Sequence, residues 1–173
     1  MQSDSPKRGY EIEPYNSEWP KKFKEIADML SKAFESKVIA IEHVGSTSIP
    51  GADAKPLIDV LVVVDDLENL KAEKETIISL GYFLREKVLE NHSILFEKFV
   101  DEEKTENIHV VEKSADLIGH FLNVRDYLRE HPERLHEYSI LKKRLKLEFP
   151  DNYQAYRAGK HDFLEETERL AKE

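Results

Sequence analysis

A chain of 173 residues, 40% hydrophobic and 35% charged, is long enough to form one compact globular domain with a substantial core. Its net charge of −9 argues against a nucleic-acid groove, which needs a basic surface, and the absence of cysteine excludes disulfides and thiolate zinc sites. The chain has neither an apolar run of membrane-spanning length nor an apolar signal at its N-terminus. We therefore expect a cytoplasmic protein without membrane or nucleic-acid partners.

The first two thirds of the chain mix strand and helix patterns. Runs of branched and aromatic residues predict strands, and apolar residues at helical spacing predict helices. We expect Ser17 to cap the first helix and Gly81 to end the second. In chain order the expected elements are a short edge strand within 10–15, a helix at 16–34, strands at 37–44 and 56–64, a helix at 67–80, strands at 82–88 and 93–100, a polar turn at 100–107 and a strand at 107–111.

The last third of the chain has a helical pattern. Pro132 and Pro150 separate three expected helices, at 114–132, 133–149 and 152–173. The middle helix carries charges of both signs, including "KKRLK", around an expected apolar face of Leu135, Leu141, Leu145 and Leu147. Strands followed by helices indicate an α+β fold. We expect one domain over 1–173, with a sheet core at about 10–113 and a helical C-terminal part at about 114–173.

One carboxylate interrupts the most apolar strand. Asp59 is the only charged residue of "PLIDVLVVV", where it shares a face with Leu57, Leu61 and Val63. An unpaired buried carboxylate costs several kcal/mol, so its environment must compensate for the charge. Asp59 is either paired with a cation such as Lys55 or an arginine, or it is a metal ligand or acid–base group in a pocket.

A glycine–serine turn precedes this strand in the stretch "HVGSTSIPG". It lacks the glycine-lysine-hydroxyl ending of a phosphate-binding P-loop. Gly45 nevertheless permits close backbone approach, and Ser46 and Thr47 offer hydroxyl groups. The turn either binds phosphate or is simply a capped turn.

The combined motif "EHVGSTSIPGADAKPLIDVLVVV" resembles the signature of the GrpB family, whose members have a nucleotidyltransferase-like fold and also occur fused to dephospho-CoA kinase. Most of the chain is similar to the family, through "IEPYNSEWPKKF", "NIHVV", "NVRDYLREHPE" and "YRAGKHDFL". The resemblance implies a nucleotidyltransferase-like mixed sheet packed by helices. It also implies the superfamily's pattern, in which Gly-Ser holds a triphosphate and a carboxylate-x-carboxylate strand holds Mg²⁺. Twelve residues separate Ser46 from Asp59, as that pattern requires.

The chain departs from this pattern at the second carboxylate, which is Leu61. Asp65 shares the strand face but lies roughly 20 Å along it, too far to substitute. Glu97 is the best candidate for a further carboxylate, with a salt bridge at an exposed sheet edge as the alternative. With Asp59 and Glu97 as the expected metal ligands, we expect one weakly held Mg²⁺ rather than two ions.

The resemblance also draws attention to polar residues outside the strand of Asp59. His109 is expected as a ligand or proton shuttle, and Asn107 shares its strand face. Lys55, Arg125 and Lys160 are the cations expected to bind substrate, although Arg125 could instead pair within its own helix.

Two functions follow from these residues. One is Mg²⁺-dependent transfer of a nucleotidyl group to a small molecule, with Asp59, Glu97 and His109 as catalytic residues. The other is binding without catalysis of a nucleotide, a coenzyme or another phosphorylated small molecule, by a protein that lost its second metal carboxylate. Leu61 is the main reason to keep the second function.

Overall fold

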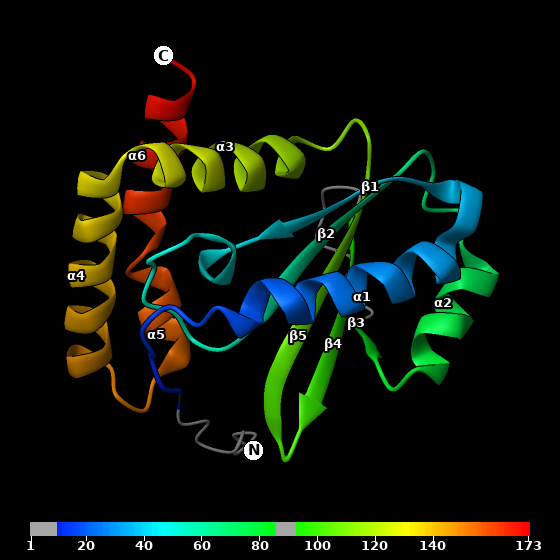
Figure 1. Ribbon diagram of the computed structural model, residues 1–173, viewed down its shortest axis with the longest axis horizontal. Coiled ribbons are helices and arrows are strands. Elements are labelled where there is room, and N and C mark those ends of the chain that lie inside the picture. Colours follow the sequence, from blue (N-terminus) through cyan, green and yellow to red (C-terminus); the bar gives the residue numbers. More distant parts are fainter. Residues whose placement is uncertain (1–9, 86–92) are drawn as a thin grey trace, which may run out of the picture.

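The computed structural model describes residues 10–85 and 93–173, and these residues form one mixed sheet covered by helices (Figure 1). The elements in chain order are α1 (Glu18–Phe34), a short 3₁₀ turn (Glu35–Lys37), β1 (Val38–Val44), a second 3₁₀ turn (Ser46–Ser48), β2 (Ile58–Val64), α2 (Lys71–Ser79), β3 (Phe83–Arg85), β4 (Ser93–Val100), β5 (Glu103–Glu112), α3 (Asp116–Glu130), α4 (Pro132–Glu148), α5 (Tyr153–Ala158) and α6 (His161–Ala171).

Within the described residues the sheet has five strands in the order β1-β2-β5-β4-β3. Strand β2 runs antiparallel to β1 and parallel to β5, so it is an interior strand with neighbours on both sides. This position explains its near-continuous apolar sequence, because interior strands covered on both faces bury all their side chains. The expectation of a mixed α+β sheet with a helical C-terminal part is confirmed.

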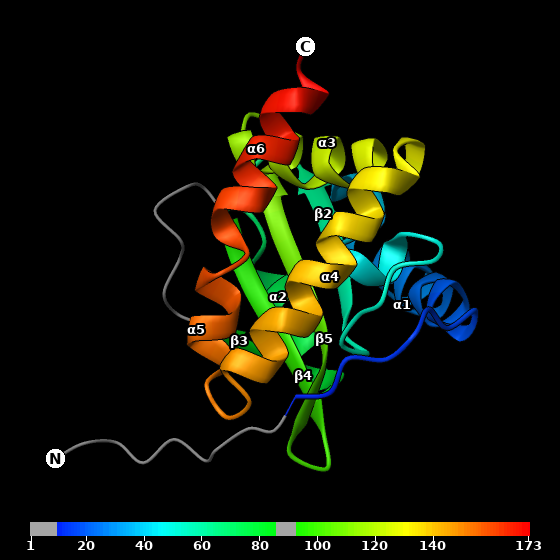
Figure 2. The same ribbon diagram turned by 90° about the vertical axis from the view of Figure 1, so that its left-hand side faces the viewer.

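Each face of the sheet carries its own apolar layer. On one face, α1 and α2 cover the even-numbered residues of β2, and Trp19 and Leu30 of α1 lie in that core at 1% and 0% exposure. On the other face, α3 packs against Leu61, Val63 and Val111. The remaining C-terminal helices α4, α5 and α6 stand together at one end of the molecule, beside the loop that joins β1 to β2 (Figures 1 and 2).

Several local expectations are corrected. Residues 10–15 form only a single bridge, between Glu13 and Ala54, rather than a strand. The side chain of Ser17 makes no capping bond; the neighbouring Asn16 carboxamide accepts the Glu18 amide at 2.9 Å instead. The turn between β4 and β5 is shorter than expected, because Asp101 and Glu102 take positive φ and β5 already begins at Glu103. Residues 86–88 of the expected strand at 82–88 lie outside the described residues.

The two C-terminal helical segments also differ from expectation. The expected helix over 152–173 is broken into α5 and α6 at Gly159 and Lys160. In α4 the buried residues are Tyr138, Ser139, Lys142 and Leu145, whereas Leu147 of the expected apolar face is 83% exposed. A lysine therefore occupies the inner face of α4, and this fact governs the site described below. No helix among residues 10–85 and 93–173 combines the length and apolar character needed to cross a membrane.

The contrast between buried and exposed leucines gives a direct test of this packing. Leu30→Ala removes a fully buried side chain and should lower the free energy of unfolding by roughly 2–5 kcal/mol through lost burial and a residual cavity. Leu147→Ala, in the exposed position, should change it by less than about 0.5 kcal/mol. Urea denaturation followed by circular dichroism measures both. An equal cost for the two variants would contradict the arrangement of α1 and α4.

Candidate functional site

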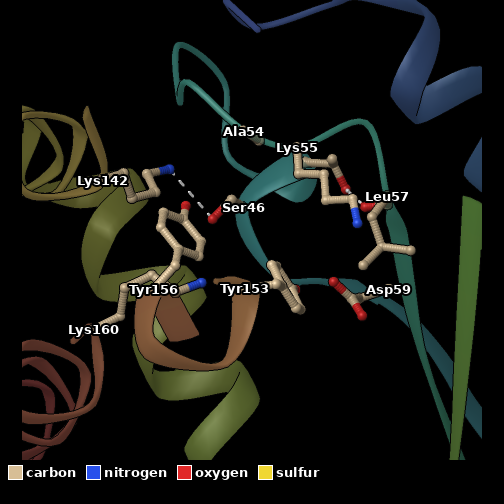
Figure 3. Close-up of a pocket in the computed structure, with 10 residues that line it drawn as sticks. Ser46, Ala54, Lys55, Leu57, Asp59, Lys142, Tyr153, Tyr156 and Lys160 are labelled. Carbon is tan, nitrogen blue, oxygen red and sulfur yellow. Dashed lines mark hydrogen bonds between the residues drawn. The ribbon is translucent and has the colours of Figure 1, made fainter. Parts of the chain in front are cut away.

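A pocket of about 70 Å³ lies where the glycine–serine turn, the start of β2 and the C-terminal helices meet. Figure 3 shows Lys55 and Asp59 on the sheet side, Lys142, Tyr156 and Lys160 on the helical side, and Tyr153 between them. Ser46 lies in the wall between the two sides. The lining thus combines three lysines with a single carboxylate, and this is the chemistry of an anion site rather than of a cation site.

Gly45 allows the turn to sit directly on the Asp59 carboxylate. Its φ is 72° and its ψ is −176°, a conformation that is essentially restricted to glycine. A Cβ atom at this position would lie 2.7 Å from the Asp59 Oδ2 atom, closer than non-bonded atoms approach. Two features therefore require glycine at this position: the backbone angle and the close contact. As a result, Ser46 and Asp59 line the same pocket.

Asp59 faces polar partners rather than a lysine or arginine. Its Oδ1 atom accepts a hydrogen bond from Asn107 Nδ2 at 2.9 Å and lies 3.4 Å from His109 Nε2. Both partners come from β5, whose parallel pairing puts Asn107 directly opposite Asp59. Among the described residues no lysine or arginine forms an ion pair with Asp59. The side chain is 22% exposed and lines the pocket, so this arrangement matches the pocket alternative and not the buried ion pair.

Lys142 is the most buried of the three pocket lysines, with 1% of its surface exposed. It donates to the Asp53 carbonyl oxygen, lies 3.4 Å from Ser46 Oγ, and packs over the Tyr138 ring at 4.3 Å from its centroid. All three partners are uncharged. Burial, with the nearby Lys160 cation as a second cause, lowers the pKa of Lys142 to about 7.

Lys55 and Lys160, both expected near the pocket, do line it. The Lys160 ammonium lies 4.6 Å from the Tyr156 ring centroid, and Lys55 lies 4.8 Å from that of Tyr153. Burial lowers the pKa of Lys160 to about 8, although the Asp59 carboxylate opposes the shift. The Tyr153 and Tyr156 rings therefore partly replace water around two ammonium groups.

Glu97 lies in the same row of the sheet, opposite Asn107, but its carboxylate is already neutralised. It forms an ion pair with Lys104 at 2.5 Å and a second ion pair with Arg85, and it is 3% exposed. This pairing corresponds to the salt-bridge alternative, with one correction. Glu97 is not at the sheet edge, because β4 lies between β5 and β3.

Two further residues expected at the pocket serve the scaffold. Arg125 of α3 donates to the Glu42 carboxylate at 2.7 Å and to the His43 carbonyl at 3.1 Å, so it ties α3 to β1 and does not line the pocket. The Thr47 hydroxyl donates to the Leu57 carbonyl at 3.1 Å and lies 3.0 Å from His43 Nε2. These contacts hold the turn against the end of β1 and the residue that precedes β2, and Thr47 also lines the pocket.

Three residues that line the pocket are not among those predicted from the sequence: Lys142, Tyr153 and Tyr156. A signal for Lys142 existed, because Tyr138, Lys142 and Leu145 recur at helical spacing on one face of α4. The charged run "KKRLK" concealed this signal, because its other three cations are not buried. Lys143 and Arg144 are exposed, and Lys146 is half-buried. Tyr156 begins the family-like segment "YRAGKHDFL", whereas no sequence pattern marks Tyr153 as a pocket residue.

The contact between Gly45 and Asp59 can be tested with a matched glycine. Gly45→Ala should lower the free energy of unfolding by roughly 2–4 kcal/mol, because backbone strain and overpacking add together. Gly51→Ala is the control, since Gly51 also has positive φ (81°) but a Cβ there would meet nothing within 4 Å. Chemical denaturation should show a smaller cost for Gly51→Ala. The Gly45 substitution should also cost less in an Asp59→Ala background, and a strictly additive double mutant would refute the contact.

The lowered pKa of Lys142 predicts a pH-dependent stability. The pKa falls from 10.5 to about 7 on folding, so between these values the unfolded chain binds more protons and the free energy of unfolding rises with pH. Lys142→Met should flatten that rise between pH 7 and 9 by up to about 1.4 kcal/mol per pH unit. Urea titrations across this range measure the slope, and Lys24→Met, which removes an exposed lysine paired with Asp28, should leave it unchanged. An unchanged slope in Lys142→Met would show that this lysine stays protonated in the fold.

Comparison with known proteins agrees with the overall fold and shows the family. The family model described as GrpB protein matches residues 10–169. UPF0157 protein YqkA of Bacillus subtilis is 36% identical over 96% of this chain, and the chain spans only 48% of that protein's length. Glutamate-rich protein GrpB of Alkalihalophilus pseudofirmus is 33% identical over 88% of this chain and 90% of that protein. The crystal structure of conserved protein GrpB from Enterococcus faecalis superposes with a TM-score of 0.87 at 29% identity, covering 93% of this chain and 96% of that one. The chain belongs to the GrpB family.

Proposed function

We propose that this protein binds the phosphate group of a phosphorylated small molecule, such as a nucleotide or a coenzyme, in the pocket beside Ser46. The observation that carries the proposal is the convergence of three lysines from separate parts of the chain. Lys55 comes from the loop before β2, Lys142 from α4, and Lys160 from the junction of α5 and α6 (Figure 3).

The energetics of the lysines support an anionic ligand. Removing ammonium groups from water is unfavourable unless an opposite charge compensates, and a lowered pKa is the sign that compensation is incomplete. Both Lys142 and Lys160 have such lowered pKa values, and among residues 10–85 and 93–173 Asp59 is the only carboxylate that lines the pocket. A bound phosphate would supply the missing negative charge and raise both pKa values again.

The size of the pocket supports a phosphate group rather than a whole nucleotide. Its volume of about 70 Å³ is well below the roughly 300–1,000 Å³ typical of pockets that enclose a complete drug-sized ligand. A phosphate would fill it, and the rest of the ligand would lie outside or require the helical side to move. Tyr153 and Tyr156 would then border the entering group.

The donor set does not fit a two-metal centre. Leu61 replaces the second carboxylate, and Glu97 is neutralised by Lys104 and Arg85. Asp59 could hold one Mg²⁺ together with Asn107 Oδ1, a buried oxygen without a hydrogen-bond partner in the described part of the chain. This oxygen favours a second candidate function, Mg²⁺-dependent nucleotidyl transfer. There the ion would offset phosphate charge while Ser46 and the lysines orient the phosphate.

Thermal shift and isothermal titration test the proposal directly. Inorganic phosphate, pyrophosphate and ATP should each stabilise the protein without metal, by roughly 5–10 °C at a hundredfold excess over Kd, whereas adenosine should not. Lys160→Met should weaken phosphate binding at least about tenfold. Lys24→Met, which removes an exposed lysine paired with Asp28, is the matched control and should bind normally. Unchanged phosphate affinity in Lys160→Met would remove the basis of the proposal.

The two candidate functions separate in an Asp59→Asn variant. For binding without metal, loss of the carboxylate removes repulsion, so phosphate affinity should rise. For Mg²⁺-dependent transfer, Mg²⁺ should tighten ATP binding to the original protein, and this gain should vanish in Asp59→Asn. A lack of any Mg²⁺ effect on ATP affinity would leave only the first function.

A further inference from the structure

We propose that Lys142 forms an imine with a small aldehyde or ketone that carries a phosphate group. The phosphate part of this ligand rests on the proposed function, whereas the carbonyl part rests on the surroundings of the Lys142 amine.

The Lys142 amine is placed as a nucleophile rather than as a partner in an ion pair. It is fully buried, lines the pocket, and donates to the Asp53 carbonyl oxygen. The nearby Asp53 carboxylate attracts the Lys142 ammonium, but its ion pair is with Lys143, at 2.7 Å from Oδ2. No carboxylate of residues 10–85 or 93–173 forms an ion pair with Lys142, in contrast to its neighbours Lys143 and Lys146.

A buried amine beside a second cation has a free lone pair near neutral pH, the condition for attack on a carbonyl carbon. The pKa of Lys142 is about 7, so its amine is neutral in about half of the protein molecules at pH 7. A lysine with the ordinary pKa of 10.5 is neutral in roughly one molecule in 3,000 at that pH. The acidity alone does not choose a ligand. The choice comes from the pocket, which Lys55 and Lys160 also line; a ligand with its phosphate beside these lysines and its carbonyl at Lys142 requires the helical side to move.

The reaction balances with groups that are present in the pocket. The Lys142 nitrogen attacks the carbonyl carbon, and a proton passes from nitrogen to oxygen to give a carbinolamine. Ser46 Oγ, 3.4 Å from the nitrogen, is positioned to relay this proton. The carbinolamine then loses its hydroxyl group as water and forms the carbon–nitrogen double bond. The lone pair on nitrogen expels the hydroxide, and the Lys160 ammonium can supply the proton that turns it into water.

Reductive trapping tests the inference on the unmodified protein. Incubation with glyceraldehyde 3-phosphate and sodium cyanoborohydride should give one adduct, located by peptide mass spectrometry at Lys142. Its rate should exceed that of the average surface lysine at least about tenfold at pH 7 and should rise with pH, following the neutral amine, with a midpoint at or above the pKa of about 7 because the bound phosphate raises that pKa. Unphosphorylated glyceraldehyde should react at Lys142 much more slowly, and inorganic phosphate should slow the labelling.

Two variants and one parallel measurement separate the outcomes. Lys142→Arg should abolish the adduct, while Lys143→Arg, on the exposed side of α4, should retain it. Labelling spread over surface lysines, or a rate equal for the two aldehydes, would overturn the inference. Thermal shift with inorganic phosphate on the same samples distinguishes failure of the imine proposal from failure of the proposed function. Stabilisation by phosphate without a Lys142 adduct refutes the imine alone, whereas absence of stabilisation refutes phosphate binding.

Discussion

The close approach of the Gly45 backbone to the Asp59 carboxylate is the constraint on which the site depends. A strand side chain normally projects into the layer above the sheet, and in β2 that layer is filled by α3 further along the strand. At Asp59 the layer is instead occupied by the returning turn, which only glycine allows to come so near. The hydroxyl of Ser46 and the carboxylate of Asp59 thereby reach the same small pocket, although one comes from the turn and the other from β2.

The helical C-terminal part supplies the remaining wall of the pocket. The break at Gly159 ends α5 and places Lys160 at the start of α6, where it reaches the pocket. A Cβ atom at Gly159 would lie 2.4 Å from the Leu145 side chain, so this junction packs tightly on α4, which carries Lys142. Two of the three pocket lysines are thus fixed by the same contact between helices.

The limits of sequence-based prediction follow from the kind of information each feature needs. Helix α1 and strands β1 and β2 could be predicted because their patterns are local, with apolar residues at helical or strand spacing. Asp59 could also be singled out, because one charge in an apolar strand contradicts the pattern around it. Lys142 could not, because a lysine among other charges looks like surface until its burial is known. The pairing of Glu97 with Arg85 and Lys104 likewise depends on which strands are neighbours, and spacing within one strand does not contain that information.

The carboxylates of this sheet do not favour a two-metal mechanism. Asp59, Asn107 and Glu97 occupy one row across β2, β5 and β4, which is where a set of metal ligands would be expected. The two carboxylates of the row differ in their partners. Glu97 forms ion pairs with two cations, whereas the hydrogen-bonding partners of the Asp59 carboxylate, among the described residues, are an amide and an imidazole. With Leu61 in place of a second carboxylate, the negative charge available near Ser46 is that of one side chain, against three lysines on the pocket wall. Such a balance attracts anions and leaves little affinity for a pair of divalent cations. This balance is why we propose that the pocket holds a phosphate through lysines rather than through metal ions.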